Sequence, residues 1–121
     1  LARIQDSRLG DAEAALRTWS AIATQYAGTA VAEDASWRLA EAYRRRGRHA
    51  EAVESYGAFV RNYRRSARAE VAQMAIAEGL EHLGRWIEAM DAYQRYLESF
   101  PEGGSAARAR EQIAWIKTYR L

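Results

Sequence analysis

The chain has 121 residues, of which 49% are hydrophobic and 28% are charged, and its formal net charge is +2. This length suffices for one domain with a hydrophobic core. No apolar run approaches the roughly 20 residues of a membrane-spanning helix, and the absence of cysteine excludes disulfides and thiolate chemistry. Because the chain starts at Leu1 with no leader-like segment, we interpret it as part of a larger protein.

The charge is unevenly distributed along the chain. Residues 38–68 contain nine Arg and three Glu, a balance of +6, so the remainder carries −4. The basic residues are 17 Arg and one Lys. A codon bias toward arginine and a functional need for guanidinium geometry both account for this preference. We expect an electrostatic partner, if there is one, to approach the middle of the chain.

A repeat of 37 residues organises the sequence. Gly10, Gly47 and Gly84 share one register, and alanines and aromatic residues recur at fixed distances after them. The recurring residues are Ala15, Ala52 and Ala89, then Trp19, Tyr56 and Tyr93. A fixed period in this range predicts a solenoid, in which each repeat is one supersecondary unit stacked on the next.

Taken in chain order, the pattern predicts alternating helices of two kinds, an alanine-rich helix A and an aromatic-rich helix B. Residues 1–9 read as the tail of a first helix A that ends at a glycine turn. The remaining helices are expected at 11–27 (B), 29–46 (A), 48–64 (B), 66–83 (A), 85–100 (B) and 105–120 (A). Thr29 and Ser66 are predicted N-caps. Residues 1–121 thus form a single domain: a partial first repeat (1–27), a second repeat (28–64), a third repeat (65–101) and a C-terminal capping helix (102–121).

The residues at the helix crossings resemble those of the tetratricopeptide repeat family. The matching runs are Leu39, Ala40, Tyr43, Gly47, Ala52 and Tyr56, and then Ile76, Ala77, Leu80, Gly84, Ala89, Tyr93 and Pro101. The resemblance covers about residues 10–121. It implies an all-α fold, a right-handed α-α superhelix of about three helix-turn-helix repeats.

Two features depart from the family pattern. The period is 37 residues rather than about 34, and the late helix-B site that is commonly alanine holds Ile22, Phe59 and Tyr96. These features are similar to a subgroup of bacterial cell-envelope proteins that includes Tol-Pal-associated and outer-membrane-assembly lipoprotein repeat domains. The resemblance favours a periplasmic or cell-envelope location, with the cytoplasm as the alternative.

The family's A helices line a concave groove that binds protein or peptide partners. Carried over to this sequence, the groove face comprises Asp34, Trp37, Arg38, Glu41, Arg44, Arg45, Val71, Met74, Glu78, Glu81, His82, Arg108, Glu111, Trp115 and Tyr119. Trp37, Met74 and Trp115 are large apolar residues at positions that the repeat pattern does not assign to the core, so we expect them to anchor a partner. The alternative is that Trp37 and Trp115 pack against adjacent helices.

No residue pattern indicates an enzyme, a cofactor or a metal site. His49 and His82 are 33 residues apart, border different glycine turns and lack further ligands at helical spacing, so we interpret them as structural or exposed. The paired carboxylates Glu51/Glu54 and Glu78/Glu81 read as solvated helix faces. The sequence therefore predicts a non-catalytic interaction scaffold.

The arginine clusters argue against nucleic-acid binding. Residues 44–48 and 61–68 lie at the two ends of one predicted helix, which places the clusters on opposite edges instead of in one basic stripe. The alternative function is a structural module that self-associates through an open solenoid end. In this reading Ile113, Ala114 and Ile116 of the last helix face inward and help to cap the other end.

Overall fold

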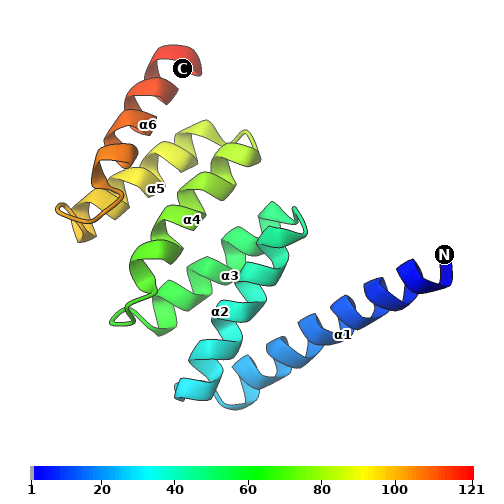
Figure 1. The fold of residues 1–121 in the computed structure, drawn as a ribbon. Helices are drawn as coiled ribbons and strands as arrows, with labels where there is room; N and C mark the ends of the chain where they lie inside the picture. Colours follow the sequence, from blue (N-terminus) through cyan, green and yellow to red (C-terminus); the bar gives the residue numbers. More distant parts are fainter. Residues whose placement is uncertain (1) are drawn as a thin grey trace.

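The computed structural model describes the fold of residues 2–121 and the side chains of residues 13–121. The described chain contains six helices and no strand: α1 (Ala2–Gln25), α2 (Ala30–Arg45), α3 (His49–Asn62), α4 (Ala69–His82), α5 (Trp86–Ser99) and α6 (Ala106–Tyr119). Consecutive helices run antiparallel and stack in chain order, with the two termini at opposite ends (Figure 1). The predicted all-α solenoid is confirmed.

The tight turns between helix A and helix B depend on glycine, as expected. Gly47 and Gly84 both have φ +73°, a left-handed conformation that glycine adopts at little cost. The two turns have the same hydrogen bonds: the N–H of Gly47 donates to Arg44 O (3.0 Å), and that of Gly84 donates to Glu81 O (2.9 Å). The repeat therefore extends to the backbone geometry of the turn.

The first glycine of the series does not mark a turn. Helix α1 runs unbroken from Ala2 to Gln25, so the predicted break at Gly10 was wrong. The residues around Gly10 are good helix formers, such as Ala12, Glu13 and Ala14. A glycine inside a helix costs only about 1 kcal/mol, which such neighbours offset. The side chains of residues 1–12 lie outside the described part of the chain.

One predicted N-cap is confirmed and one is not. Thr29 caps α2, and its hydroxyl accepts a hydrogen bond from the N–H of Ala32 at 3.2 Å. Helix α4 begins later than predicted, at Ala69, and the hydroxyl of Ser66 accepts from the N–H of Arg68 in the preceding turn. A hydroxyl that bonds two residues ahead stabilises a turn, which competes with capping.

The core combines small residues on the A helices with aromatic residues on the B helices. Ala40 and Ala77 are fully buried, and the side chains that pack around them include Tyr56, Phe59, Tyr93 and Tyr96. Small side chains let two helix backbones approach closely, and large ones fill the space that remains between them. This packing fixes how far apart successive A helices lie.

The last helix differs from the prediction at one position. Ile113 (8% exposed) and Ile116 (0% exposed) are buried against α5, but Ala114 is exposed. Ala114 lies one repeat after Ala77, which α5 covers. No helix of the described chain covers the equivalent side of α6, so the prediction that Ala114 faces inward was wrong.

Candidate functional site

A cleft of about 460 Å³ lies between α2 and α4 on the face that the A helices form. We call it the α2–α4 cleft, and its volume is within the range of about 300–1,000 Å³ that is usual for ligand pockets. It brings together seven of the residues assigned to the groove from sequence: Trp37, Glu41, Arg44, Val71, Met74, Glu78 and His82. Sequence reasoning did not include the other lining residues, which are His49, Ala52, Tyr56, Ala75, Gly79 and Ser105.

The cleft is open because the residues that bridge the next junction are replaced here. Between α4 and α6, Arg108 donates to Glu78 at 2.9 Å, and Gln112 donates to Glu81 at 2.9 and 3.1 Å. One repeat earlier, Val71 stands in the place of Arg108 and Ala75 in the place of Gln112. Neither of these side chains can form such a bridge to α2. The opening therefore follows from two substitutions within the repeat.

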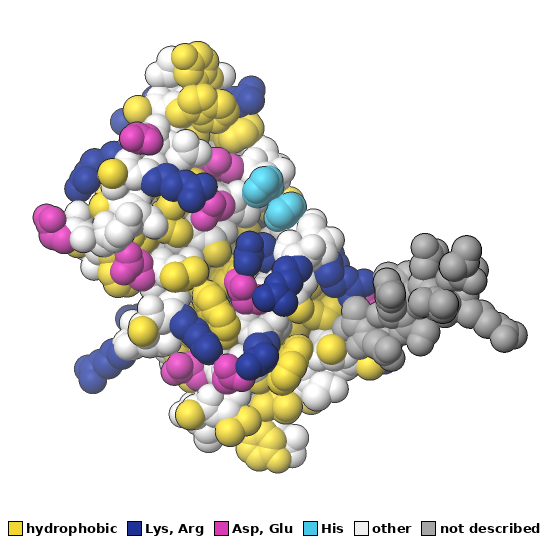
Figure 2. Space-filling model, in the orientation of Figure 1, with side chains coloured by type: hydrophobic (Ala, Val, Ile, Leu, Met, Phe, Trp, Pro, Cys, Tyr) yellow, Lys and Arg dark blue, Asp and Glu magenta, His cyan; other side chains and the backbone are white. Residues whose placement is uncertain are grey.

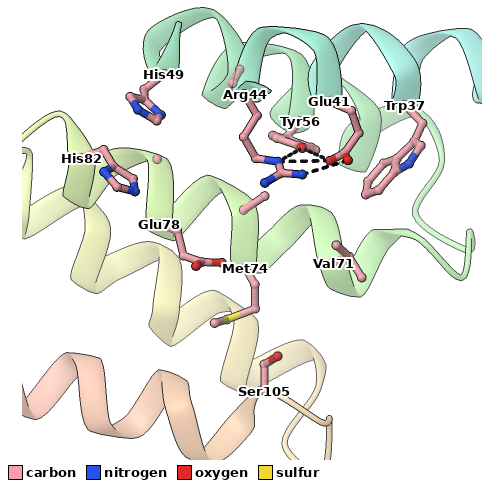
Figure 3. A pocket seen from close by; sticks show the side chains of 13 residues that line it. Trp37, Glu41, Arg44, His49, Tyr56, Val71, Met74, Glu78, His82 and Ser105 are labelled. Carbon is pink, nitrogen blue, oxygen red and sulfur yellow. Dashed lines mark hydrogen bonds and ion pairs between the residues drawn. The ribbon is translucent and has the colours of Figure 1, made fainter. Parts of the chain in front are cut away.

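A charged network occupies the middle of the cleft (Figure 3). Arg44 donates to Glu41 from Nε (3.3 Å) and from Nη2 (3.0 Å), and its Nε also bonds the hydroxyl of Tyr56 at 3.1 Å. The hydroxyl of Tyr56 in turn donates to Glu41. Partial burial would raise the pKa of Glu41, but the hydrogen bonds from Arg44 and Tyr56 lower it below its ordinary value. The hydrogen bond to Glu41 also raises the pKa of Arg44, so both groups are charged at neutral pH.

One end of the cleft is apolar. Trp37 is partly buried, and its ring lies 5.6 Å from that of Tyr56 and 5.4 Å from that of Phe59. Val71 faces it from α4 and is 56% exposed (Figure 3). The two alternatives for Trp37 are therefore not exclusive, because the same ring packs on the core and lines the cleft.

Met74 is buried in the core, contrary to the expectation that its side chain lies outside the core and anchors a partner. Its side chain is 4% exposed and belongs to the core cluster of α4, α5 and α6. It points from α4 toward Ser105 and away from Arg44 (Figure 3). A residue three positions after Val71 lies partly on the neighbouring face of the helix, and α5 and α6 cover that face.

The two histidines meet at the other end of the cleft. The rings of His49 and His82 are stacked, with centroids 4.5 Å apart and planes inclined by 8°. They form one cyan patch beside dark blue basic side chains in Figure 2. Their separation of 33 residues in the sequence does not by itself indicate this contact. In an antiparallel stack, however, the end of one helix A lies beside the start of the preceding helix B, so the repeat topology could have predicted this pair.

A neighbouring hollow, which Trp37 and Glu41 also border, contains three further predicted groove residues: Asp34, Arg38 and Arg45. Trp19, Ala42 and Arg68 complete its lining. Asp34 forms ion pairs with Arg38 (2.7 Å) and Arg68 (3.2 Å). These hydrogen bonds, first of all the one from Arg38, lower the pKa of Asp34 despite its partial desolvation. This hollow extends the concave surface toward α1.

The predicted groove residues of α6 are divided between two locations. Arg108 of α6 bridges to Glu78 of α4, and the predicted groove residue Glu81 of α4 accepts from Gln112 of α6. Trp115 (38% exposed) and Tyr119 (67% exposed) belong instead to an aromatic group with Trp86, over which Arg120 lies at 4.8 Å from the ring of Trp86 and 5.1 Å from that of Trp115. Trp115 and Trp37 thus do not line one cleft.

The described residues offer no other chemistry that would define the site. Within residues 13–121 no group of three or more His, Asp or Glu side chains could hold a metal ion. No described helix combines the length and the apolarity needed to cross a membrane. Fold and site together define a helical-repeat solenoid with an open cleft between two of its A helices.

Comparison with known proteins assigns the family. The sequence profile of the tetratricopeptide repeat matches residues 34–66 and 71–103, which is more than half of the chain. The chain belongs to the tetratricopeptide repeat family, whose repeats generally mediate protein–protein interactions. No curated protein matches the chain.

Proposed function

We propose that this protein is a non-catalytic interaction scaffold that binds a peptide or a partner helix in the groove formed by α2, α4 and α6. The observation that carries the proposal is the α2–α4 cleft, where exposed apolar and charged side chains lie together without bridging the two helices. Trp and Arg are enriched at the energetic centres of protein interfaces, and Trp37 and Arg44 both line this cleft.

A binding role fits the state of the ionisable groups better than catalysis does. The cleft's carboxylates Glu41 and Glu78 are engaged in ion pairs with Arg44 and Arg108. Burial, first of all, raises the pKa of Tyr56, so its phenol stays protonated at neutral pH. The lowered pKa of Glu41 and the raised pKa of Tyr56 both move these groups away from pH 7, where a general base would titrate. We infer that the site needs neither a cofactor nor a metal, and that nucleic acid is not its ligand.

Self-association is a second candidate, favoured by the two ends of the solenoid. Ala114 of α6 and Tyr26, which directly follows α1, are exposed, whereas the residues in register with them, Ala77 and Tyr63, are buried and partly buried. Each end therefore presents a face that another helix covers elsewhere in the repeat. Light scattering over a concentration series tests this candidate: growth of the mean mass supports it, and a constant monomer mass removes it.

A selection experiment tests the groove directly. A displayed library of random peptides of about 12 residues is selected on the wild-type chain, and the bound peptides are measured on two variants. Ala75→Gln places in the cleft the side chain that bridges the next junction, and Ala107→Gln makes the same change on the exposed side of α6.

We expect Ala75→Gln to weaken binding of the selected peptides at least tenfold and Ala107→Gln to leave it unchanged. Equal binding by all three proteins would contradict the groove proposal. The bacterial cell-envelope location that the resemblance implies stays a prediction, which localisation of the protein in its own organism would test.

A further inference from the structure

The α2–α4 cleft contains a hydrogen-bond donor that its neighbours leave unused. Nε and Nη2 of Arg44 bond Glu41 and Tyr56, but Nη1 donates to no residue in the described part of the chain. The side chain of Arg44 is 51% exposed, so this nitrogen is accessible from the cleft. The carboxylates of the cleft already have cationic partners, because Glu41 is paired with Arg44 and Glu78 with Arg108. Nη1 of Arg44 is satisfied by a partner that supplies a hydrogen-bond acceptor.

The neighbouring junction indicates the position of that acceptor. Between α4 and α6, the amide of Gln112 reaches across and donates to the carboxylate of Glu81. One repeat earlier, Arg44 stands in the place of Glu81 and Ala75 in the place of Gln112. In place of the acceptor Glu81, the cleft therefore has the cationic donor Arg44, and Ala75 supplies no bridging side chain that corresponds to Gln112. A group that fills the vacant space must accept hydrogen bonds, and a carboxylate does so best beside a guanidinium.

The surroundings of Arg44 indicate what lies next to such a carboxylate. His49 and His82 border Arg44 on one side, and their ring N–H groups add further donors (Figure 3). On the other side Trp37 and Val71 face each other across an apolar opening. An occupant that complements both parts has one acidic side chain and one large apolar side chain close together.

We propose that the α2–α4 cleft binds a peptide segment whose side-chain carboxylate accepts hydrogen bonds from Arg44, beside an apolar residue that packs between Trp37 and Val71. This inference rests on the proposed groove function and specifies the chemistry of the partner. The carboxylate is assigned to a side chain because the groups that bridge the equivalent junction, Arg108 and Gln112, are side chains as well.

The selected peptides provide the test, because each displayed peptide is flanked on both sides and has no free C-terminal carboxylate. We expect Asp or Glu to be enriched at one position, next to a large apolar residue. A selected peptide is then synthesised with an amidated C-terminus, together with a version in which the acid is replaced by its amide. On the wild-type chain the amide version should bind about tenfold more weakly, the loss typical of one charge-assisted hydrogen bond.

The same pair of peptides is compared on two protein variants. On Arg44→Gln the difference between acid and amide should fall below twofold. On Arg95→Gln, which makes the same change on the exposed side of α5 and outside the cleft, the tenfold difference should persist. The tenfold difference between acid and amide is measured on the intact wild-type protein, so a folding defect of Arg44→Gln cannot produce it.

The possible failures are distinguishable. If peptides are weakened by Ala75→Gln but show no enriched acid, or if acid and amide bind equally to the wild-type chain, the acidic partner is refuted while groove binding stands. If the acid–amide difference is the same on Arg44→Gln as on the wild-type chain, the carboxylate binds elsewhere and the role of Arg44 is refuted. Peptides that are insensitive to Ala75→Gln refute both proposals.

Discussion

Two tyrosines in register give a matched test of the network that lines the cleft. Tyr56 and Tyr93 are one repeat apart, and both are buried. The hydroxyl of Tyr56 is bonded to Glu41 and Arg44, whereas that of Tyr93 has no hydrogen-bond partner among the described residues. Burial, with a contribution from nearby Glu81, raises the pKa of Tyr93, so its hydroxyl is protonated. Replacing each tyrosine by phenylalanine should therefore have opposite effects.

The magnitudes follow from the partners that each hydroxyl has. Tyr56→Phe removes hydrogen bonds to charged groups, which contribute about 1.5–3 kcal/mol each. Glu41 and Arg44 still pair with each other in the variant, so we expect the free energy of unfolding to fall by about 1–2 kcal/mol. Tyr93→Phe removes an unbonded buried hydroxyl, whose burial costs about 1–3 kcal/mol. That variant should be as stable as the wild type or more stable by about 1 kcal/mol.

Urea denaturation followed by circular dichroism at the helical band measures both variants. For a chain of this length, 1 kcal/mol corresponds to a shift of about 4 °C in Tm, so thermal melts supply a second readout. The reasoning is refuted if Tyr56→Phe matches the wild type, or if the two variants lose equal stability. An equal loss would mean that aromatic packing alone, and not the network with Glu41, determines the effect.

Three further predictions concern single positions. Gly47→Ala should reduce the free energy of unfolding by about 1–2 kcal/mol, because this position has a positive φ. Gly57 lies inside α3, where an added Cβ would make only an ordinary van der Waals contact with Arg61. Gly57→Ala should therefore raise the free energy of unfolding by about 0.5–1 kcal/mol in the same urea titrations. Ala77→Leu should cost about 1–3 kcal/mol by overpacking, while Ala114→Leu, in register but exposed, should change Tm little. Because the pKa of Glu41 is lowered in the fold, its ionised form stabilises the protein above its ordinary pKa of 4.5, and this contribution is lost as the pH falls through the lowered value. Glu41→Gln should thus be less stable than the wild type at pH 7. In thermal melts at pH 3 and below, the difference in stability between the two proteins should shrink. A constant difference across that range would contradict the assigned network.

The repeat made most of the fold predictable. Glycine, alanine and aromatic residues at a fixed period determine where an A helix ends, where helices approach closely and which side chains fill the gaps, and Gly47, Ala77 and Tyr96 have those roles in the structure. The pattern failed at Gly10, where the same residue type lies inside a helix. A glycine permits a turn but does not enforce one, so periodicity alone could not decide between the two outcomes.

The cleft was harder to predict because it depends on differences between repeats. The resemblance to the repeat family implies which positions of helix A face the groove, and Trp37, Glu41 and Arg44 at those positions line the cleft. The opening itself arises because Ala75 replaces a bridging residue, and such an absence is visible only once the bridge at Gln112 is known. How deeply a side chain such as that of Met74 is buried depends on how neighbouring helices cross, and the 37-residue period does not specify this geometry.

The four tryptophans allow the central claim to be measured directly. Trp37 lines the α2–α4 cleft and borders the neighbouring hollow, Trp19 lines that hollow but not the cleft, and Trp86 and Trp115 belong to the aromatic group of α5 and α6. Their indole N–H signals can be followed in a ¹H–¹⁵N NMR titration with a selected peptide, after assignment by single Trp→Phe variants. If the cleft is the binding site, the signal of Trp37 shifts most and those of Trp86 and Trp115 stay in place. A titration that moves Trp86 and Trp115 but leaves Trp37 unchanged would contradict the account.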